Sequence, residues 1–500
     1  MMPIYDLVIA LGCSLARMMA AYIISVIIAL VTGSAMARNR VVEAVTLPIL
    51  DVLQSIPILG FFPVVLVFFI GSLPKPIGAE AAAVFLIVTS LVWNMIFGVY
   101  ASIKSLDASI FDMARVFSLG PASKFFYIYT PASKSALLAN TLVSWAGGWF
   151  FLTSAEVISM GEKEYRLLGV GSFILESFDR GDYFNFYLGV CALILAILLT
   201  YVLVWNPAIT SLWSLPLVCV GGVYDRVSSF IAVLWDGVRE VFTYLESKVR
   251  VPRAATRILA SFLVLLLLLL LLRAITGLSS VNLHDVAVSF VHELPLSLLR
   301  VALILLFSFL LSLAISYGTY KSRGPGYLFT LSGEILASIP AIIWWPLLAR
   351  IALASSAGPL LVSFIVLLQG AVWYLFFNII VFGLANIRRE HEELALVYKI
   401  RGRHFFSSIF LPSISPSVAS GALSAWGGAW NATVVAEYVV LSGKLFDLGG
   451  VGALLNRYTA QGKTGEVALA ALFLSVFIVL INKAIWSRIF SGISGRFAGE

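Results

Sequence analysis

Charged residues are scarce in this sequence. Asp, Glu, Lys and Arg make up 12% of its 500 residues, whereas a soluble domain carries about 25%. Cysteine is scarcer still: Cys13, Cys191 and Cys219 lie far apart without CxxC spacing, which favours buried thiols over a disulfide or a metal site. No GxxxxGK[ST] motif occurs, so the chain has no P-loop of its own for a nucleotide.

The sequence also lacks a constellation typical of an active site. Its 4 histidines are dispersed, and no metal-ligand spacing, activated nucleophile or pair of carboxylates stands out. We therefore expect no metal, no cofactor and no enzymatic activity in this chain.

Apolar residues, in contrast, dominate the chain. They form 60% of it, and the mean hydropathy is +1.00. Stretches of about 20 apolar residues, enough to cross about 30 Å of hydrocarbon, recur along the whole length. The pattern predicts an all-α polytopic protein of the cell membrane. The start of the chain lacks a basic region and a small-residue cleavage site, so we expect an uncleaved first helix rather than a signal peptide.

The first half is predicted to contain five spans, at about 7–35, 45–70, 79–101, 131–156 and 184–205. Basic side chains gather on one side of these spans, and that side is expected to be cytoplasmic. They are Arg38, Arg40, Lys104, Arg115, Lys124 and Lys134. This orientation places the N-terminus outside and the C-terminus in the cytoplasm. The net charge of +7 follows from such loops and indicates no nucleic-acid partner.

Residues 206–257 interrupt the pattern of spans. They mix prolines and glycines with basic residues, and apolar residues recur at helical spacing over 224–249. We expect a cytoplasmic linker whose amphipathic helix lies on the membrane surface; the alternative is a further short span at 208–222. The predicted organisation is a transmembrane domain at 1–205, the linker at 206–257, and a transmembrane domain at 258–500 that opens with an additional span at 258–272. This makes about eleven transmembrane helices in all.

The two transmembrane domains are copies of one another. Offsets of 281 positions separate Pro131 from Pro412 (412 − 131), Trp145 from Trp426 and Glu156 from Glu437, while 283 positions separate Arg17 from Arg300. A fixed offset of this length indicates a fused duplication. Because both copies have the same predicted orientation, the repeat is parallel, with its axis along the membrane normal, and the transport pathway is expected on that axis.

Each copy carries a polar, amphipathic stretch on the predicted cytoplasmic side. One begins at Asp112 and the other at Glu393, and each continues with apolar residues towards a proline, Pro131 or Pro412. A short helix here could present its apolar face to a groove on a soluble protein. Both copies keep the acid, the alanine and the proline at fixed spacing, which favours a partner-binding loop over an ordinary solvated one.

This stretch resembles the EAA loop of ABC-importer permeases, in which Glu-Ala-Ala is followed by a glycine and, further on, by Leu-Pro. Ser118 and Lys399 stand where that family usually has glycine, and Gly120 and Gly402 lie nearby, displaced from it. The residues that the resemblance assigns to the two ATPase-coupling loops are Asp112, Met113, Ala114, Phe117, Ser118, Gly120 and Pro131, and Glu393, Leu394, Ala395, Tyr398, Lys399, Gly402 and Pro412.

Other stretches are similar to permeases for nitrate, sulfonate, taurine and bicarbonate. SIPILGFFP (55–63) and SIPAIIWWP (338–346) resemble the proline-rich second core helix of that group. The tryptophan pairs followed by Ala-Glu and then Gly-Val-Gly resemble its AE…GLG segment. The resemblance covers nearly all of both halves and implies two type I ABC importer transmembrane domains, fused here in one chain.

The resemblance also implies partners and a mechanism. Two cytoplasmic ATPase subunits, one at each loop, would bind ATP and Mg, and an external solute-binding protein would deliver a small solute, anions included. Membrane lipid would surround the chain, and access would alternate with ATP binding and hydrolysis. The alternative class is a secondary transporter driven by an ion gradient, in which the inner loops are only structural.

Four charged residues lie within or at the ends of predicted spans: Arg17, Glu156, Arg300 and Glu437. Such groups usually pair with one another or line a pathway. Either they form a charged external vestibule that receives substrate, or each arginine pairs with a glutamate and ties the first core helix to the fourth. Unpaired arginines would favour an anionic ligand.

Prolines, tryptophans and glycines are expected to shape helix packing or a gate. The candidates are Pro57, Pro63, Trp145, Trp149, Pro340, Pro346, Trp426 and Trp430. Small residues allow helices to approach closely in membranes. The glycines beside the tryptophans therefore indicate packing between the two halves, or a hinge; they are Gly147, Gly148, Gly427 and Gly428.

Overall fold

The structure is a computed structural model of the chain. It describes residues 4–55, 58–160, 163–205, 281–322, 344–384, 389–441 and 444–486, with 229, 233, 235–241, 244, 333, 336–337, 387 and 488. The predicted span at 258–272 and the alternative span at 208–222 lie outside the described residues, as do Pro57 and Pro340. Within the predicted linker helix at 224–249, the described residues are helical.

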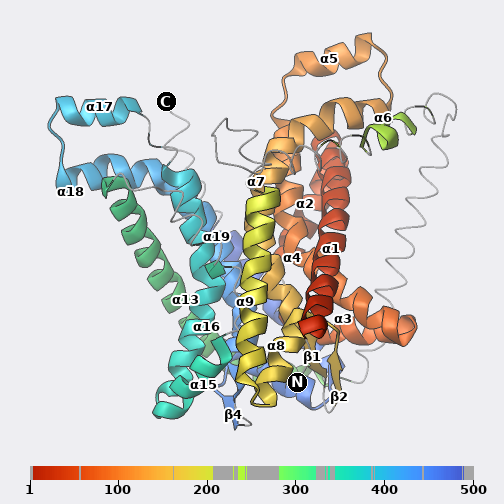
Figure 1. The fold of residues 1–500 in the computed structure, drawn as a ribbon. Coiled ribbons are helices and arrows are strands. Elements are labelled where there is room, and N and C mark those ends of the chain that lie inside the picture. Colours follow the sequence, from red (N-terminus) through yellow and green to blue (C-terminus); the bar gives the residue numbers. More distant parts are fainter. Residues whose placement is uncertain are drawn as a thin grey trace.

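The first half is a bundle of long helices with short elements at each end (Figure 1). Its order is α1 (Ile4–Arg38), α2 (Arg40–Ser55), α3 (Ile58–Ser72), α4 (Lys75–Lys104), α5 (Ala108–Val116), α6 (Pro121–Lys124), the π-helical turn η1 (Phe125–Tyr129), α7 (Thr130–Glu156), β1 (Val157–Met160), β2 (Lys163–Arg166), α8 (Val170–Asp179), α9 (Tyr183–Thr200) and η2 (Tyr201–Trp205).

The second half repeats this order. Its described elements are α13 (Leu283–Ser322), α15 (Trp345–Ala354), α16 (Gly358–Phe377), η4 (Asn378–Gly383), α17 (Arg389–Val397), α18 (Gly402–Phe405), η6 (Phe406–Phe410), α19 (Leu411–Ala436), β3 (Tyr438–Leu441), β4 (Lys444–Asp447), α20 (Val451–Ala460), α21 (Thr464–Ile481) and η7 (Asn482–Trp486). From α17 to η7, each element begins 281 positions after its counterpart between α5 and η2, as for α17 and α5 (389 − 108). The duplication predicted from the sequence is therefore confirmed as a structural repeat.

The second predicted span, at 45–70, is wrong as a single helix. α2 ends at Ser55 and α3 begins at Ile58, and in Figure 1 α3 runs across the long axis of α1. In the sequence Pro57 stands between the two helices, and a proline both disfavours helical backbone in the residue before it and lacks the N–H of a helical hydrogen bond. With 16 and 15 residues, α2 and α3 are each shorter than the about 20 residues that a straight crossing needs.

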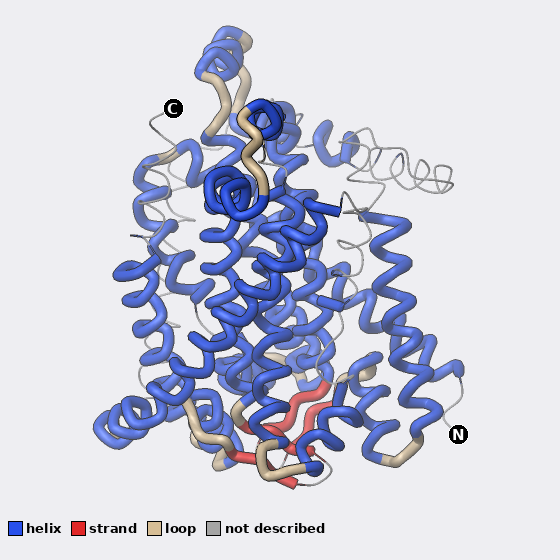
Figure 2. The backbone as a smooth tube through the Cα atoms, turned by 90° about the vertical axis from the view of Figure 1, so that its left-hand side faces the viewer, coloured by secondary structure: helices blue, strands red, loops and turns tan. Residues whose placement is uncertain are grey.

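Seven helices in the described part of the chain are long and apolar enough to cross a membrane, and both halves contribute to them. The described residues confirm the predicted all-α polytopic fold, to which two short antiparallel hairpins, β1–β2 and β3–β4, are added. Their first strands are rich in β-branched residues, as in Val157-Ile158 and Val439-Val440, which favours strand over a continuation of the preceding helix. Figures 1 and 2 place both hairpins at the end of the molecule opposite to α5 and α17.

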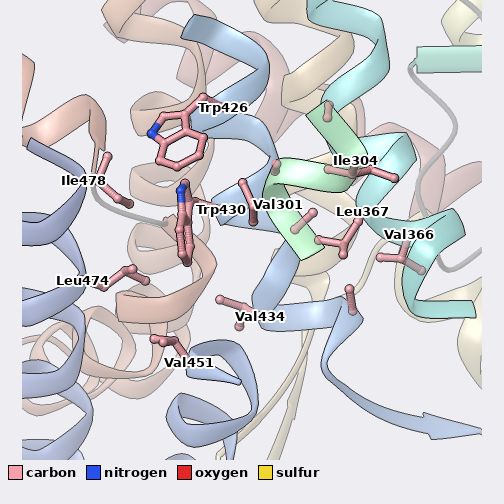
Figure 3. Packing of buried hydrophobic residues seen from close by; sticks show 14 of the residues in the cluster. Val301, Ile304, Val366, Leu367, Trp426, Trp430, Val434, Val451, Leu474 and Ile478 are labelled. Carbon is pink, nitrogen blue, oxygen red and sulfur yellow. The ribbon is translucent and has the colours of Figure 1, made fainter. Parts of the chain in front are cut away.

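Each half has a hydrophobic core of its own, built around a tryptophan pair on the helix that precedes the hairpin. In the second half Trp430 is fully buried and meets Trp426 edge to face, with ring centroids 5.6 Å apart (Figure 3). In the first half Trp149 and Trp145 repeat this arrangement at 6.4 Å. The halves meet where α2 and α3 contact α21, and where Trp344 packs against both cores.

Candidate functional site

Two short helices, α5 and α17, stand at the same end of the molecule (Figure 1). In each, one alanine points inward, Ala114 at 2% and Ala395 at 4% exposure. The large apolar side chains around it face outward, and Phe117 and Tyr398 are each 72% exposed. Equivalent positions of the two loops have the same burial from residue 110 to 119 and from 391 to 400. Met113, Val116, Leu394, Leu396 and Val397 are exposed as well. The chain thus presents two short helices with the same pattern of exposed apolar side chains, and we call α5 and α17 the coupling helices, after the family loops that they resemble in sequence.

Both coupling helices end in the same hydrogen-bonded turn. The N–H of Leu119 donates to the carbonyl of Ala114 (2.9 Å), and that of Ser118 to Arg115 (3.0 Å); Ile400 and Lys399 donate in the same way to Ala395 and Leu396. This is the Schellman motif, whose penultimate residue needs a left-handed backbone and is usually glycine. Ser118 (φ 50°) and Lys399 (φ 54°) adopt that conformation without being glycine. The Schellman turn therefore forms at equivalent positions of the two loops, although neither position has a glycine.

The nearby glycines and prolines have other positions. Gly120, with φ −71°, caps the start of α6, whereas Gly402, with φ +59°, is the first residue of α18. Pro131 and Pro412 are the second residues of α7 and α19, where the missing proline N–H costs little. The displaced glycines thus do not replace Ser118 and Lys399 in closing the turn.

Acidic residues mark both coupling helices. Asp112 is exposed and forms an ion pair with Arg115 one turn later, and Glu393 is exposed at the equivalent position. Asp107 caps α5, because its carboxylate accepts a hydrogen bond from the N–H of Ser109 (2.8 Å). This bond to the backbone holds the pKa of the Asp107 carboxyl below its usual range. The start of α5 is thereby fixed.

At the opposite end, the four membrane charges form two equivalent clusters. In the first, Arg17 from α1 donates to Glu156 at the end of α7 (2.9 Å), and Ser14 donates to the same carboxylate (2.5 Å). The other carboxylate oxygen accepts from the N–H of Gly171 (2.7 Å), while Ser14 accepts from the N–H of Val170 (2.9 Å). Serine and glutamate thus satisfy the first two N–H groups of α8, which have no partner within the helix.

The second cluster repeats these contacts with the equivalent residues. Arg300 donates to Glu437 (3.1 Å), Ser297 to the same carboxylate (2.7 Å), and Glu437 accepts from the N–H of Gly452 (2.8 Å). The N–H of Val451 donates to Ser297 (2.7 Å). Of the two alternatives for the membrane charges, an open vestibule or arginine–glutamate pairs, the structure has the pairs. Because both arginines are paired, they give no indication of an anionic ligand.

Close approach explains the glycines that precede α8 and α20. A Cβ on Gly169 or on Gly450 would overlap the carboxylate of Glu156 or Glu437. Gly450 also has φ +108°, which side-chain-bearing residues rarely adopt. Each glutamate is therefore enclosed by backbone as well as by side chains.

The clusters differ in their outer partners, which sequence reasoning missed. Arg17 also donates two hydrogen bonds to the carboxylate of Glu80 on α4, at 2.6 and 2.7 Å. Arg300 instead donates to the carbonyls of Leu448 and Gly449, each at 2.7 Å. The serines carried a signal, since Ser-Leu-Xaa-Arg occurs at 14–17 and again at 297–300, but Glu80 has no repeated counterpart.

Two of the four glycines beside the tryptophans pack against residues of their own half. A Cβ on Gly148 would meet Met18 and Leu91 of its own half, and one on Gly428 would meet Gly370 and Tyr374 of its own half. The expected packing between the halves is therefore wrong for Gly148 and Gly428, whereas for Gly147 and Gly427, where a Cβ would meet nothing within 4 Å, it stays a prediction. Pro63 lies within α3 and Pro346 in the first turn of α15.

Comparison with known proteins adds to this geometry. The family model described as binding-protein-dependent transport system inner membrane component matches the chain twice, at 23–205 and 308–490. The nitrate import permease protein NrtB of Leptolyngbya laminosa is 28% identical over 149 residues, 30% of this chain and 50% of that protein. The bicarbonate transport system permease protein CmpB of a Synechocystis species is 23% identical over 188 residues, 36% of this chain and 62% of that protein.

A probable ABC transporter permease of Brucella melitensis is 24% identical over 147 residues, 29% of this chain and 56% of that protein. The chain thus spans between half and about three fifths of the length of these relatives. The two matches of the family model follow the structural repeat and together cover most of the chain. The chain therefore belongs to the family of binding-protein-dependent transport system inner membrane components, the permeases of ABC importers, and carries the family's domain twice.

Proposed function

We propose that this single chain supplies the whole membrane pathway of an ATP-driven importer, and that α5 and α17 each dock on one cytoplasmic ATPase subunit. The observation that carries the proposal is the pair of coupling helices, with the same burial and the same Schellman turn but apolar side chains left exposed. Exposed apolar patches of this kind mark binding surfaces. A short helix with an apolar face fits a groove on a soluble partner.

The energy source follows from what the sequence contains. Because no P-loop motif occurs in the chain, ATP and Mg would be bound by the partner subunits. The family description, binding-protein-dependent, supports a solute-binding protein on the other side. We place α5 and α17 in the cytoplasm and the hairpins outside, in agreement with the basic residues near α5 and α17. Two relatives are named for nitrate and bicarbonate, which supports a small solute.

Charge reversal on the coupling helices tests the proposal. Glu393→Lys and Asp112→Lys would place a cation where each partner is expected to offer one, so the ATPase should dissociate or hydrolyse ATP without transport. Co-purification and ATP turnover of the complex measure this. Glu390→Lys is the matched control, because it makes the same change one turn earlier on α17, where the first copy has Ser109 and no acid.

The outcomes separate the two transporter classes. Loss of assembly or coupling with Glu393→Lys, but not with Glu390→Lys, supports the proposal. If assembly and ATP turnover survive the double variant of Asp112 and Glu393, the coupling-helix proposal is wrong. Solute uptake that persists in vesicles without any ATPase subunit would identify a secondary transporter instead.

A further inference from the structure

A cavity lies at the boundary of the two halves, between α7 of the first and α16 and α19 of the second. Three pairs of repeat equivalents line it: Gly147 and Gly428, Phe150 and Asn431, and Phe151 and Ala432, each 281 positions apart. A cavity lined by equivalent residues of both copies lies near the axis that relates them. In a parallel repeat, that axis is where a transport pathway runs.

The walls of this cavity are aromatic. Phe150 and Phe151 contribute from α7, and Trp373, Tyr374 and Phe377 contribute from α16. None of the described residues that line it carries a charge. An ion that enters such a space within the membrane loses its hydration without gaining a counter-charge, which is costly. A flat apolar body, in contrast, gains contact with several rings.

The amide groups of the cavity already have partners. Asn431 accepts a hydrogen bond from the N–H of Ile58 and donates to the carbonyl of Gly427 (3.2 Å). Gln369 donates to the carbonyl of Leu336 (2.7 Å). The indole N–H of Trp373 is buried and has no hydrogen-bond partner among the described residues. The same holds for six other buried tryptophan indoles among the described residues, so this N–H does not by itself indicate a ligand.

We propose that this cavity is the solute site of the pathway, and that it takes a small, flat, uncharged solute that packs against the aromatic rings of its walls. The inference rests on the proposed transport function and names the class of solute. Two relatives are named for nitrate and bicarbonate, which are anions. The described lining has no cation to receive an anion, and Arg17 and Arg300 are held by glutamates at the ends of α7 and α19.

Cysteine labelling of the full chain in its complex tests the site. Gly147→Cys is introduced after Cys13, Cys191 and Cys219 have been changed to serine, because Gly147 lines the cavity and a Cβ there would meet nothing within 4 Å. Gly427→Cys is the matched control: a Cβ there also meets nothing, but Gly427 is not among the lining residues. The probes are two thiol reagents, neutral benzyl methanethiosulfonate and anionic sulfonatoethyl methanethiosulfonate.

The ratio of the two labelling rates, normalised to a free thiol in solution, is the measurement. We expect Gly147→Cys to favour the benzyl reagent by about tenfold more than Gly427→Cys does, since a charge is disfavoured in an uncharged site. Equal ratios at both positions would assign the preference to the bilayer and overturn the proposal. Faster labelling of Gly147→Cys by the anionic reagent would overturn it too.

Ligand protection provides the second measurement. Benzamide is flat and neutral, so it should slow the labelling of Gly147→Cys, whereas nitrate and bicarbonate should not. Protection by nitrate or bicarbonate, or the absence of protection by benzamide, contradicts the proposal. ATP turnover of the same variants shows separately whether the importer function holds.

Discussion

At the residue scale, the two arginine–glutamate pairs differ in the hydrogen-bond partners that each arginine would keep if its glutamate were neutralised. Arg17 is 6% exposed and keeps a second carboxylate, Glu80, which it grips through two hydrogen bonds. Arg300 is 14% exposed and, among the described residues, keeps backbone carbonyls as its remaining hydrogen-bond partners. Removing one partner of a buried pair leaves an uncompensated charge and costs about 3–5 kcal/mol. The two clusters should therefore tolerate neutralisation unequally.

Glu437→Gln is expected to destabilise the protein more than Glu156→Gln. The amide keeps the shape of the carboxylate, but it leaves Arg300 without a negative partner, whereas Arg17 still has Glu80. We expect Glu437→Gln to cost about 3–5 kcal/mol and Glu156→Gln clearly less. Thermal unfolding of the purified chain in detergent measures the difference. The double change of Glu80 and Glu156 to glutamine should bring the first cluster to the cost of Glu437→Gln. An equal loss from the two single variants would show that Glu80 does not compensate.

At the element scale, each coupling helix closes on a residue in left-handed backbone, and neither Ser118 nor Lys399 is suited to it. A left-handed conformation costs a side-chain-bearing residue about 1–2 kcal/mol, and glycine removes most of this cost. Ser118→Gly and Lys399→Gly should therefore stabilise the ends of α5 and α17 by about 1 kcal/mol. Slower hydrogen exchange at Leu119 and Ile400, whose N–H groups close the turns, measures the effect.

Valine at the same positions provides the opposite control. Ser118→Val adds a β-branched side chain to the strained backbone, so exchange at Leu119 should become faster. Unchanged exchange in both Ser118→Gly and Ser118→Val would mean that the Schellman turn does not depend on the residue at this position.

The repeat made much of this architecture predictable from the sequence. A fixed offset located α7 and α19, the coupling helices and both glutamates, because a duplicated chain must bury the same positions twice. It could not locate what only one copy has: Glu80 has no acidic counterpart, since the burial patterns of α4 and α16 match at an offset of 280 (360 − 80), which makes Leu360 the equivalent position. The two hairpins could not be predicted from hydrophobic periodicity either, because four-residue strands such as Val157–Met160 are too short to show a period.

At the scale of the whole molecule, the two halves are joined by a contact that only one of them can make. Ile58 is the first residue of α3, so its N–H has no partner within that helix. Asn431 of α19 accepts a hydrogen bond from it and thereby caps a helix of the other half. The equivalent of Asn431 in the first half is Phe150, which has no acceptor to offer. The interface is therefore built for two unlike halves.

A divided chain tests this asymmetry. Residues 1–205 and 206–500, expressed together as separate chains, should purify as one complex, because α2 and α3 pack on α21 and Asn431 caps Ile58. Tagged 1–205 should recover untagged 1–205 poorly, since Phe150 would then face the N–H of Ile58.

Asn431→Leu in the longer piece leaves that N–H buried without a partner, and should lower recovery by at least about fivefold. Asn456→Leu, which removes bonds only within the second half, is the control and should leave recovery unchanged. If tagged 1–205 recovers its own copy as well as it recovers the longer piece, the halves pair through their shared features, and Asn431 does not determine which half is bound.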